Sequence, residues 1–155
     1  MKFPNKVTFK LIDKETKKPI FNIATLLVLY AHRKNNYSVG IMISDENGFV
    51  HFTENDCLKE IENLKSMFLM DYSSDLEDCL PKVSLEIMAD QQIKRVIKER
   101  RENREIFSKY WDCSEEFLQR LEKVDNSLYM PKSYDFTEAD LWEEKVLEIQ
   151  LEKVK

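Results

Sequence analysis

The stretch that decides the fold covers residues 13–52 and reads DKETKKPIFNIATLLVLYAHRKNNYSVGIMISDENGFVHF. Its longest apolar run, residues 23–32, is apolar on both faces, which predicts a strand that is covered on both sides or central in its sheet. Residues 37–44 alternate between apolar and polar side chains and predict a second strand. Asn47-Gly48 supplies the positive φ angles of a tight turn, so we predict a β-hairpin in which residues 49–53 are the partner strand.

Outside this stretch, two further segments alternate with a period of two. Residues 6–12 and 82–88 are therefore predicted strands. Between them the period changes to about 3.6, and Thr53 followed by Asp56 has the pattern of a helix start. We predict a helix over residues 54–65, a short strand over 67–72 and a loop over 73–81.

The C-terminal part of the sequence has mainly helical periodicity. Residues 90–111 contain no glycine or proline and predict one long helix. Residues 114–129 predict a second helix, and the short link between the two favours an antiparallel helical pair. Residues 130–136 are predicted to be a loop.

The tail, residues 137–155, allows two interpretations. Thr137 and Asp140 resemble a helix start, whereas Leu147, Ile149 and Leu151 alternate with polar residues. One continuous helix would place apolar side chains on two opposite faces, which packs badly in a small domain. We favour a short helix followed by a final strand over residues 145–153.

The resulting fold class is α+β. A chain of 155 residues with 43% apolar side chains is long enough to form one domain around a single core. We expect an antiparallel β-sandwich over residues 6–88 that includes the short helix. A C-terminal helical hairpin over 90–129 and the tail with its possible final strand complete this single domain.

Several features of the composition exclude or disfavour classes of protein. The two glycines, Gly40 and Gly48, cannot form a glycine-rich phosphate-binding loop. The first ten residues lack the apolar region of a signal peptide, and no apolar run is long enough to span a bilayer. Three widely separated cysteines suit reduced thiols better than a disulfide framework. We therefore expect a cytoplasmic protein without a membrane segment.

The motifs Asp13-x-x-Thr16-x-x-Pro19-Ile20 and Asp45-x-Asn47-Gly48-x-Val50-x-Phe52 carry a family resemblance. They resemble the first-strand exit and the hairpin of the transthyretin-like (prealbumin-like) sandwich, a superfamily that includes the carboxypeptidase regulatory-like domains. The resemblance covers about residues 6–88. It implies a β-sandwich. The enzymatic branch that hydrolyses 5-hydroxyisourate ends in Tyr-Arg-Gly-Ser, whereas this chain ends in LEKVK, so no catalytic residue is carried over.

Reactive side chains are few, and their spacing does not indicate catalysis. His32 and His51 lie at or near predicted strand ends and favour ordinary packing over metal binding, because no C-x-x-C or H-x-x-x-H spacing is present. No local context marks Cys57, Cys79 or Cys113 as an activated nucleophile. We predict no catalytic residue, no metal and no cofactor.

The predicted helix over residues 90–111 carries the candidate binding surface. Residues 91–110 contain seven Lys or Arg against three Asp or Glu, a local charge of +4 in a chain of net charge −5. Arg100 and Arg104 fall on the same side of the helix as its apolar residues. The alternative is that these charges are only solvated or offset by neighbouring glutamates. A separate basic stripe on another face is formed by Lys94, Lys98 and Arg101.

The main hypothesis is a non-enzymatic cytoplasmic interaction module, or a small subunit of a larger assembly, that binds an acidic partner protein through its helical addition. Arginine suits bidentate contacts with carboxylates. Three alternatives stay open. They are an immunity protein that neutralises a toxin, a nucleic-acid-binding protein that uses the basic helix, and a small hydrolase built on His32, His51 and nearby acids. Nucleic acid is the less favoured partner, because aromatic residues do not interleave with the basic ones.

Overall fold

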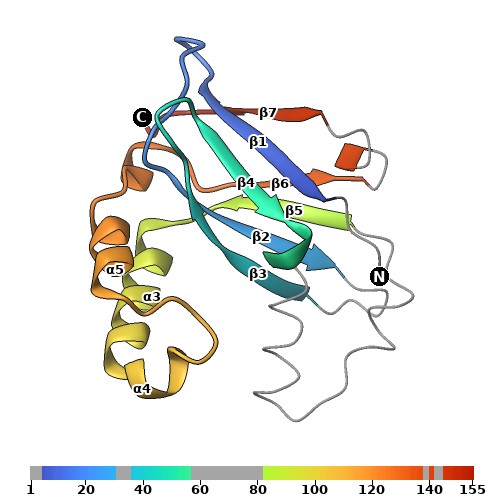
Figure 1. Ribbon diagram of the computed structural model, residues 1–155. Coiled ribbons are helices and arrows are strands. Elements are labelled where there is room, and N and C mark those ends of the chain that lie inside the picture. Colours follow the sequence, from blue (N-terminus) through green and yellow to red (C-terminus); the bar gives the residue numbers. More distant parts are fainter. Residues whose placement is uncertain (1–4, 31–35, 57–81, 138–139, 142–144) are drawn as a thin grey trace.

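The computed structural model in Figure 1 describes residues 5–30, 36–56, 82–137, 140–141 and 145–155. It is a mixed α+β structure with two β-sheets. The first sheet has three strands in the order β4-β1-β7, which are Phe49–Thr53, Lys6–Asp13 and Val146–Leu151. Strand β1 pairs antiparallel with β4 and parallel with β7. The antiparallel arrangement was predicted for residues 6–88 only, and β7, which lies outside that range, joins β1 in parallel after the intervening helices and strands.

The second sheet has four antiparallel strands in the order β3-β2-β5-β6. These strands are Asn36–Ile43, Ala24–Tyr30, Lys82–Ile87 and Ser133–Phe136. Strand β2 lies between β3 and β5, which confirms the central position predicted from its apolar run. Its consecutive residues Leu26 and Leu27 pack in different apolar clusters, so both faces of the strand are covered.

The two sheets share one hydrophobic core, which we call the inner core. Phe9 of β1 is fully buried, and its ring centroid lies 6.2 Å from that of Phe52 and 5.2 Å from that of Phe136. Because Phe136 belongs to the second sheet, these contacts connect the two sheets directly. Val50, Leu85 and other alternating strand residues complete the inner core. Its position explains why period-two alternation is so clear in the sequence.

The predicted hairpin was wrong in its strand pairing. The turn over residues 45–48 forms, with the Gly48 amide donating to the Asp45 carbonyl at 2.9 Å, but of the two residues predicted to have positive φ only Gly48 has it, at +80°. However, β3 pairs with β2, and β4 pairs with β1. The turn therefore carries the chain from one sheet to the other. The Leu11 amide donates to the Gly48 carbonyl at 2.8 Å, so the chain joins β1 as soon as it leaves the turn.

One other prediction is corrected and three are confirmed. The predicted loop over residues 130–136 contains β6, which pairs with the edge of β5. The final strand is confirmed as β7. Helix starts are confirmed at Thr53 and Thr137, where the hydroxyl of each threonine accepts from the amide three residues on, at 3.1 and 3.4 Å. The predicted strand over 67–72, the loop over 73–81 and the remainder of the helix over 54–65 lie outside the described residues.

Helices α3 (Asp90–Glu102) and α5 (Glu115–Glu122) pack on the outer face of the second sheet (Figure 1). Ile93 and Ile97 of α3 are buried against Leu118 and Leu121 of α5. Ala24 and Met88 join them, and we call this group the outer cluster. None of the helices in the described ranges combines the length and apolar character that crossing a bilayer requires.

Asp13 lies at the end of β1 and organises the turn that follows it. Its side chain is 5% exposed and accepts from the amides of Glu15 at 2.9 Å and Thr16 at 3.0 Å. The Tyr129 hydroxyl donates to the same carboxylate at 3.2 Å. The amide hydrogen bond from Thr16 is the largest contribution that lowers the pKa of Asp13 below its ordinary value of 3.8, against the opposing effect of burial.

This lowered pKa predicts how the stability of the protein depends on pH. Because the folded-state pKa of Asp13 is depressed, its contribution is fully present above the unfolded pKa of about 4 and is lost as the pH falls through the folded pKa. We expect Asp13→Asn to be less stable than wild type at pH 7, and the difference to shrink below pH ~4. Urea denaturation across this range checks it. A difference that stays constant to the lowest pH would contradict the assignment.

Candidate functional site

The helical addition begins where the chain leaves β5. Ala89 is extended, Asp90 starts α3, and the negative charge of Asp90 is favourable at a helix N-terminus. Ile93 and Ile97 hold one face of α3 on the outer cluster. Gln92, Val96 and Glu99 follow at helical spacing on an adjacent face, where Val96 also packs against the outer cluster.

The predicted helix over residues 90–111 was wrong in its length, because α3 ends at Glu102. Asn103 has φ −120° and ψ 30°, outside helical values, and its side-chain amide donates to the Glu99 carbonyl at 2.9 Å. This side chain competes with the backbone for the helix's hydrogen bonds, which is why asparagine favours helix ends. The short helix α4 (Arg104–Phe107) and a turn through Trp111 then reverse the chain.

Helix α5 is also shorter than predicted. The Ser114 hydroxyl accepts from the Phe117 amide at 3.3 Å and caps its start. The helix ends at Glu122 instead of continuing to residue 129. A 3₁₀ turn, η1 (Asn126–Leu128), follows, because the Asp125 amide donates to the Asn22 carbonyl at 2.9 Å and ties the chain to the sheet. The region predicted as two long helices thus contains three shorter ones, α3, α4 and α5.

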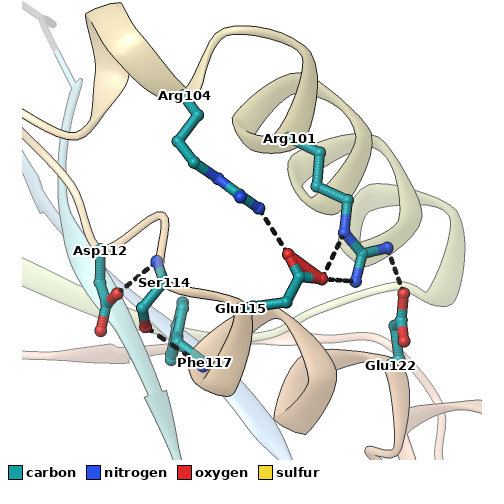
Figure 2. A network of polar contacts seen from close by, with 7 residues as sticks. All are labelled: Arg101, Arg104, Asp112, Ser114, Glu115, Phe117 and Glu122. Atoms are coloured by element: carbon teal, nitrogen blue, oxygen red, sulfur yellow. Dashed lines mark hydrogen bonds and ion pairs between the residues drawn. The ribbon is translucent and has the colours of Figure 1, made fainter.

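An ionic network connects α3 and α4 to α5 (Figure 2). Arg101 donates to Glu115 at 2.9 Å and also to Glu122, and Arg104 donates to the second oxygen of Glu115. Hydrogen bonds from Arg101 and then Arg104 lower the pKa of the Glu115 carboxyl. Arg104 was predicted to lie with Arg100, but Glu115 instead places it beside Arg101. Both arginines therefore already have acidic partners within the chain.

Arg100 lies on the other side of α3 and holds the 108–114 turn. Its guanidinium donates to the Asp112 carbonyl at 3.0 Å and lies 5.7 Å from the ring centroids of both Trp111 and Phe117. Within about 6 Å of a ring centroid, a guanidinium is attracted to the face of the aromatic ring. Arg100 is thus a support for the aromatic residues of the turn.

The remaining predicted site residues lie along the exposed side of α3. Lys94 pairs with Asp90 at 2.9 Å and Lys98 with Glu102 at 4.0 Å, and both lysine side chains are 74% exposed. Lys94, Lys98 and Arg101 line one shallow hollow, as the predicted stripe required. Ion pairs this exposed contribute little to stability.

A cavity of about 230 Å³ lies between the outer face of the second sheet and the helical addition, and we call it the sheet–helix cavity. Its floor comes from β2 and β3, and its walls come from α3, α4 and the turn after α4. Next to it, the ring centroids of Phe107 and Trp111 lie 5.1 Å apart in an edge-to-face arrangement. The lining is mainly apolar, with polar groups from Ser38, Gln92, Glu99 and Arg100. Its apolar members are Leu26, Gly40, Ile41, Met88, Val96, Phe107 and Trp111.

Sequence reasoning missed this cavity apart from Arg100. The helical half left one signal, the spacing of Gln92, Val96 and Glu99 on a face that is neither fully apolar nor fully polar. The sheet half left none, because Ser38 and Gly40 lie more than fifty residues earlier and belong to what reads as an ordinary strand. Their meeting with α3 is a tertiary contact.

The other candidate residues are dispersed. His51 lies exposed on β4, where its ring stacks on Phe49 at 5.9 Å and its Nδ1 is 3.0 Å from the Thr8 hydroxyl. Burial and the charge of Lys6 lower the pKa of His51. Cys113 is buried, and burial raises the pKa of its thiol. His32, Cys57 and Cys79 lie outside the described residues. Within the described ranges, no three His, Cys, Asp or Glu side chains cluster so as to hold a metal ion.

Comparisons with known proteins assign no family to the chain. No protein-family model matches it, and no curated protein matches it. Among solved structures, a 9R-lipoxygenase from Cyanothece PCC8801 matches with a TM-score of 0.32 and 17% sequence identity. The match covers 53% of this chain and 10% of the lipoxygenase chain. A similarity of this size carries no conclusion about fold or activity.

Proposed function

We propose that this protein is a non-enzymatic binding module that holds an apolar group of a partner protein in the sheet–helix cavity. The observation that carries the proposal is the cavity itself. Beside the closely packed outer cluster, the same sheet face is left open over Gly40 and Leu26 and bordered by Phe107 and Trp111. A mainly apolar hollow with a few polar groups at its border is typical of a ligand site.

The chemistry of the lining suits a side chain of a protein. Leu26, Ile41 and Val96 provide apolar contact, and burying a large aliphatic or aromatic side chain against such surface contributes about 1.5–3 kcal/mol. Glu99 and Arg100 offer one acceptor group and one donor group beside it. Aromatic and arginine residues are enriched at the centres of protein interfaces.

The exposed basic residues of α3 favour an acidic partner surface beside this site. Lys94 and Lys98 are strongly exposed, and their exposed ion pairs cost little to rearrange. An acidic partner surface next to the apolar anchor would complement them and accelerate association. Arg101 and Arg104 contribute less directly, because they hold Glu115 and so fix the position of α5.

The architecture and location remain part of the same proposal. The shared inner core of the two sheets supports a β-sandwich, and the motifs at residues 13–20 and 45–52 support one of the transthyretin-like kind. A cytoplasmic protein, acting as a small subunit of a larger assembly, is supported by the net charge of −5 and the odd number of cysteines.

Filling the cavity from its floor tests the proposal. Ser38 is exposed, lines the cavity and pairs with Val28, which lies on the same face of β2 as Leu26. We expect Ser38→Phe to remain folded and to lose at least about 90% of a partner that wild type captures from its native host, because one blocked anchor costs at least about 1.4 kcal/mol. Quantitative mass spectrometry of the captured proteins measures this.

Ser38→Ala is the matched control, since it changes the same position without filling the cavity and should retain the partner. Circular dichroism and the thermal midpoint must show that both variants are folded. If no stoichiometric protein is captured by wild type, or if Ser38→Phe captures it as well as Ser38→Ala does, the proposed site is wrong.

A further inference from the structure

We infer that the outer face of the first sheet binds single-stranded nucleic acid, with a base stacked on His51 and the phosphates held by nearby lysines. This surface is separate from the sheet–helix cavity, so the inference goes beyond the proposed function. It rests on three observations, which are an aromatic pair on the sheet, lysines that strand pairing places beside it, and an adjoining hollow that two lysines line.

The outer face is formed by side chains of β4, β1 and β7 that point away from the inner core (Figure 1). Phe9, Val50 and Leu147 belong to the inner core, and side chains alternate along a strand, so their neighbours point outward. The outward side chains include those of Lys6, Thr8, Lys10, Phe49, His51, Thr53, Val146, Glu148 and Gln150. Each of these residues is exposed or half-buried, so a ligand can reach the face.

Phe49 and His51 form an aromatic pair on this face. Their ring centroids lie 5.9 Å apart, and the ring planes are 18° from parallel. The Nδ1 atom of His51 is 3.0 Å from the Thr8 hydroxyl, so the imidazole is oriented by two neighbours. Burial, followed by the charge of Lys6, lowers the pKa of His51 below its ordinary value of 6.5, so the ring is uncharged at pH 7. A nucleic-acid base can stack on an oriented, exposed ring of this kind.

Strand pairing places lysines between and beside these rings. Lys10 lies opposite Phe49, and its Nζ atom is 5.6 Å from the centroid of the Phe49 ring. Lys6 lies one outward pair beyond His51. The lysines and the rings are about forty residues apart in the sequence, so neither segment shows the pattern alone. Basic residues interleaved with aromatic ones, which α3 lacks, are typical of sites for single-stranded nucleic acid.

A hollow of about 250 Å³ continues the face towards β7. Thr8 lies opposite both His51 and Val146, so the hollow begins one strand spacing, about 4.8 Å, from the aromatic pair. Lysine ammonium groups bind phosphate as point charges. The hollow therefore suits a phosphate next to the nucleotide whose base stacks on His51. Its lining residues are Asn5, Lys6, Thr8, Lys145 and Val146.

The charge of the face favours a polyanion. Two carboxylates act here, since Glu148 lies opposite Lys10 and the charge of Asp45 acts on His51. They are outnumbered by Lys6, Lys10, Lys145 and Lys17, the last of which donates to Gln150 at 3.1 Å. The face is thus basic in a chain whose net charge is −5. An acidic peptide would satisfy the lysines but would leave the aromatic pair without a role, so we assign the site to nucleic acid.

Fluorescence anisotropy with the full chain and a labelled single-stranded oligonucleotide of about 12 nucleotides tests this inference. We expect saturable binding that weakens as salt increases. His51→Ala should weaken it at least about fivefold because a stacked base is lost, and His51→Phe, which keeps a ring, should bind like wild type. Lys6→Gln combined with Lys10→Gln should reduce the slope of log Kd against log salt by about 1.4, which is about 0.7 for each lost phosphate contact. Ribose and deoxyribose forms of one sequence distinguish RNA from DNA as the ligand.

The matched control is Lys94→Gln combined with Lys98→Gln, which removes the same charge from α3 and should leave binding unchanged. Ser38→Phe, which fills the sheet–helix cavity, should also leave it unchanged. Thermal midpoints must show that all variants are folded. The inference is overturned if neither oligonucleotide binds saturably, if His51→Ala binds like wild type, or if the duplex binds as tightly as the single strand. Equal losses in the α3 control would also overturn it. These outcomes do not bear on partner capture at the cavity, so the two proposals can fail separately.

Discussion

Gly48→Ala should lower the free energy of unfolding by about 3 kcal/mol or more. Gly48 has φ +80°, where a residue with a Cβ is strained. A Cβ at this position would lie 2.5 Å from the Leu11 carbonyl oxygen and 3.2 Å from the Ile20 nitrogen. The Leu11 carbonyl cannot move away easily, because it accepts a hydrogen bond from the Ile20 amide at 3.0 Å. Strain and steric overlap therefore act together.

The other glycine of the chain provides a matched control. Gly40 lies in β3, and a Cβ there meets no heavy atom within 4 Å. Gly40→Ala should be neutral or stabilise the protein by about 0.5–1 kcal/mol, because alanine loses less conformational entropy on folding. Urea denaturation of both variants measures the contrast. Equal midpoints for the two variants would show that the chain does not cross between the sheets as closely as Gly48 requires.

Asn126→Ala is the second substitution with a large expected effect. It should lower the free energy of unfolding by about 3–5 kcal/mol, because it removes three buried hydrogen bonds. The Asn126 side chain is 2% exposed and reaches from η1 to the sheet. Its oxygen accepts from the Ala24 amide at 2.8 Å, and its nitrogen donates to the carbonyls of Ala24 at 2.9 Å and Met88 at 2.8 Å. Alanine leaves these backbone groups buried without this partner, and an unsatisfied buried group costs about 1–3 kcal/mol.

Two further variants separate this mechanism from general damage. Asn103→Ala removes an asparagine side chain that donates one hydrogen bond at an exposed helix end. It should lower the free energy of unfolding by less than about 1 kcal/mol. Asn126→Asp keeps the acceptor oxygen but replaces the NH₂ group with an oxygen that faces two carbonyl oxygens. Because this carboxylate is charged at pH 7, the loss of stability relative to wild type should be larger at pH 7 than at pH 4. Thermal denaturation at both values checks this. Asn126→Ala within about 1 kcal/mol of wild type would refute the role of Asn126 as the link between η1 and the sheet.

Local patterns in the sequence predicted the elements that depend on neighbouring residues. The two helix starts at Thr53 and Thr137 form because each threonine hydroxyl reaches an amide only three residues away. The cap at Ser114 has the same origin. Alternation of apolar residues predicted the strands that face the inner core, including β7. In each case the contact that decides the structure joins residues close in the sequence, or is repeated along one face of a strand.

Helix ends depended on longer contacts and were predicted less well. Helix α5 stops at Glu122 because the chain beyond it is drawn to Asn22 and Ala24 of the sheet, about a hundred residues earlier. The strand β6 was missed because four residues with a period of two are too short a signal, and the pairing with β5 decides their conformation. The break at Asn103 had a local signal in the asparagine itself.

For the candidate site, the sequence located the basic residues but not their roles. Arg101 and Arg104 hold Glu115, and Arg100 holds the 108–114 turn. Charge alone could not distinguish an arginine that awaits a partner from one that stabilises its own helical pair. The sheet–helix cavity was not predictable, because its two halves are separated by about fifty residues and neither is unusual alone.

The stretch over residues 13–52 illustrates the division between sequence and tertiary structure. By itself the sequence determined the turn at Asn47-Gly48, the strands on either side of it and the apolar character of β2 on both faces, because these depend on φ preference and on period. Only the tertiary structure decided that β3 and β4 join different sheets. A tight turn specifies a change of direction but not the partner of each strand, and here β4 pairs with β1 in one sheet and β3 with β2 in the other, with the inner core between the sheets.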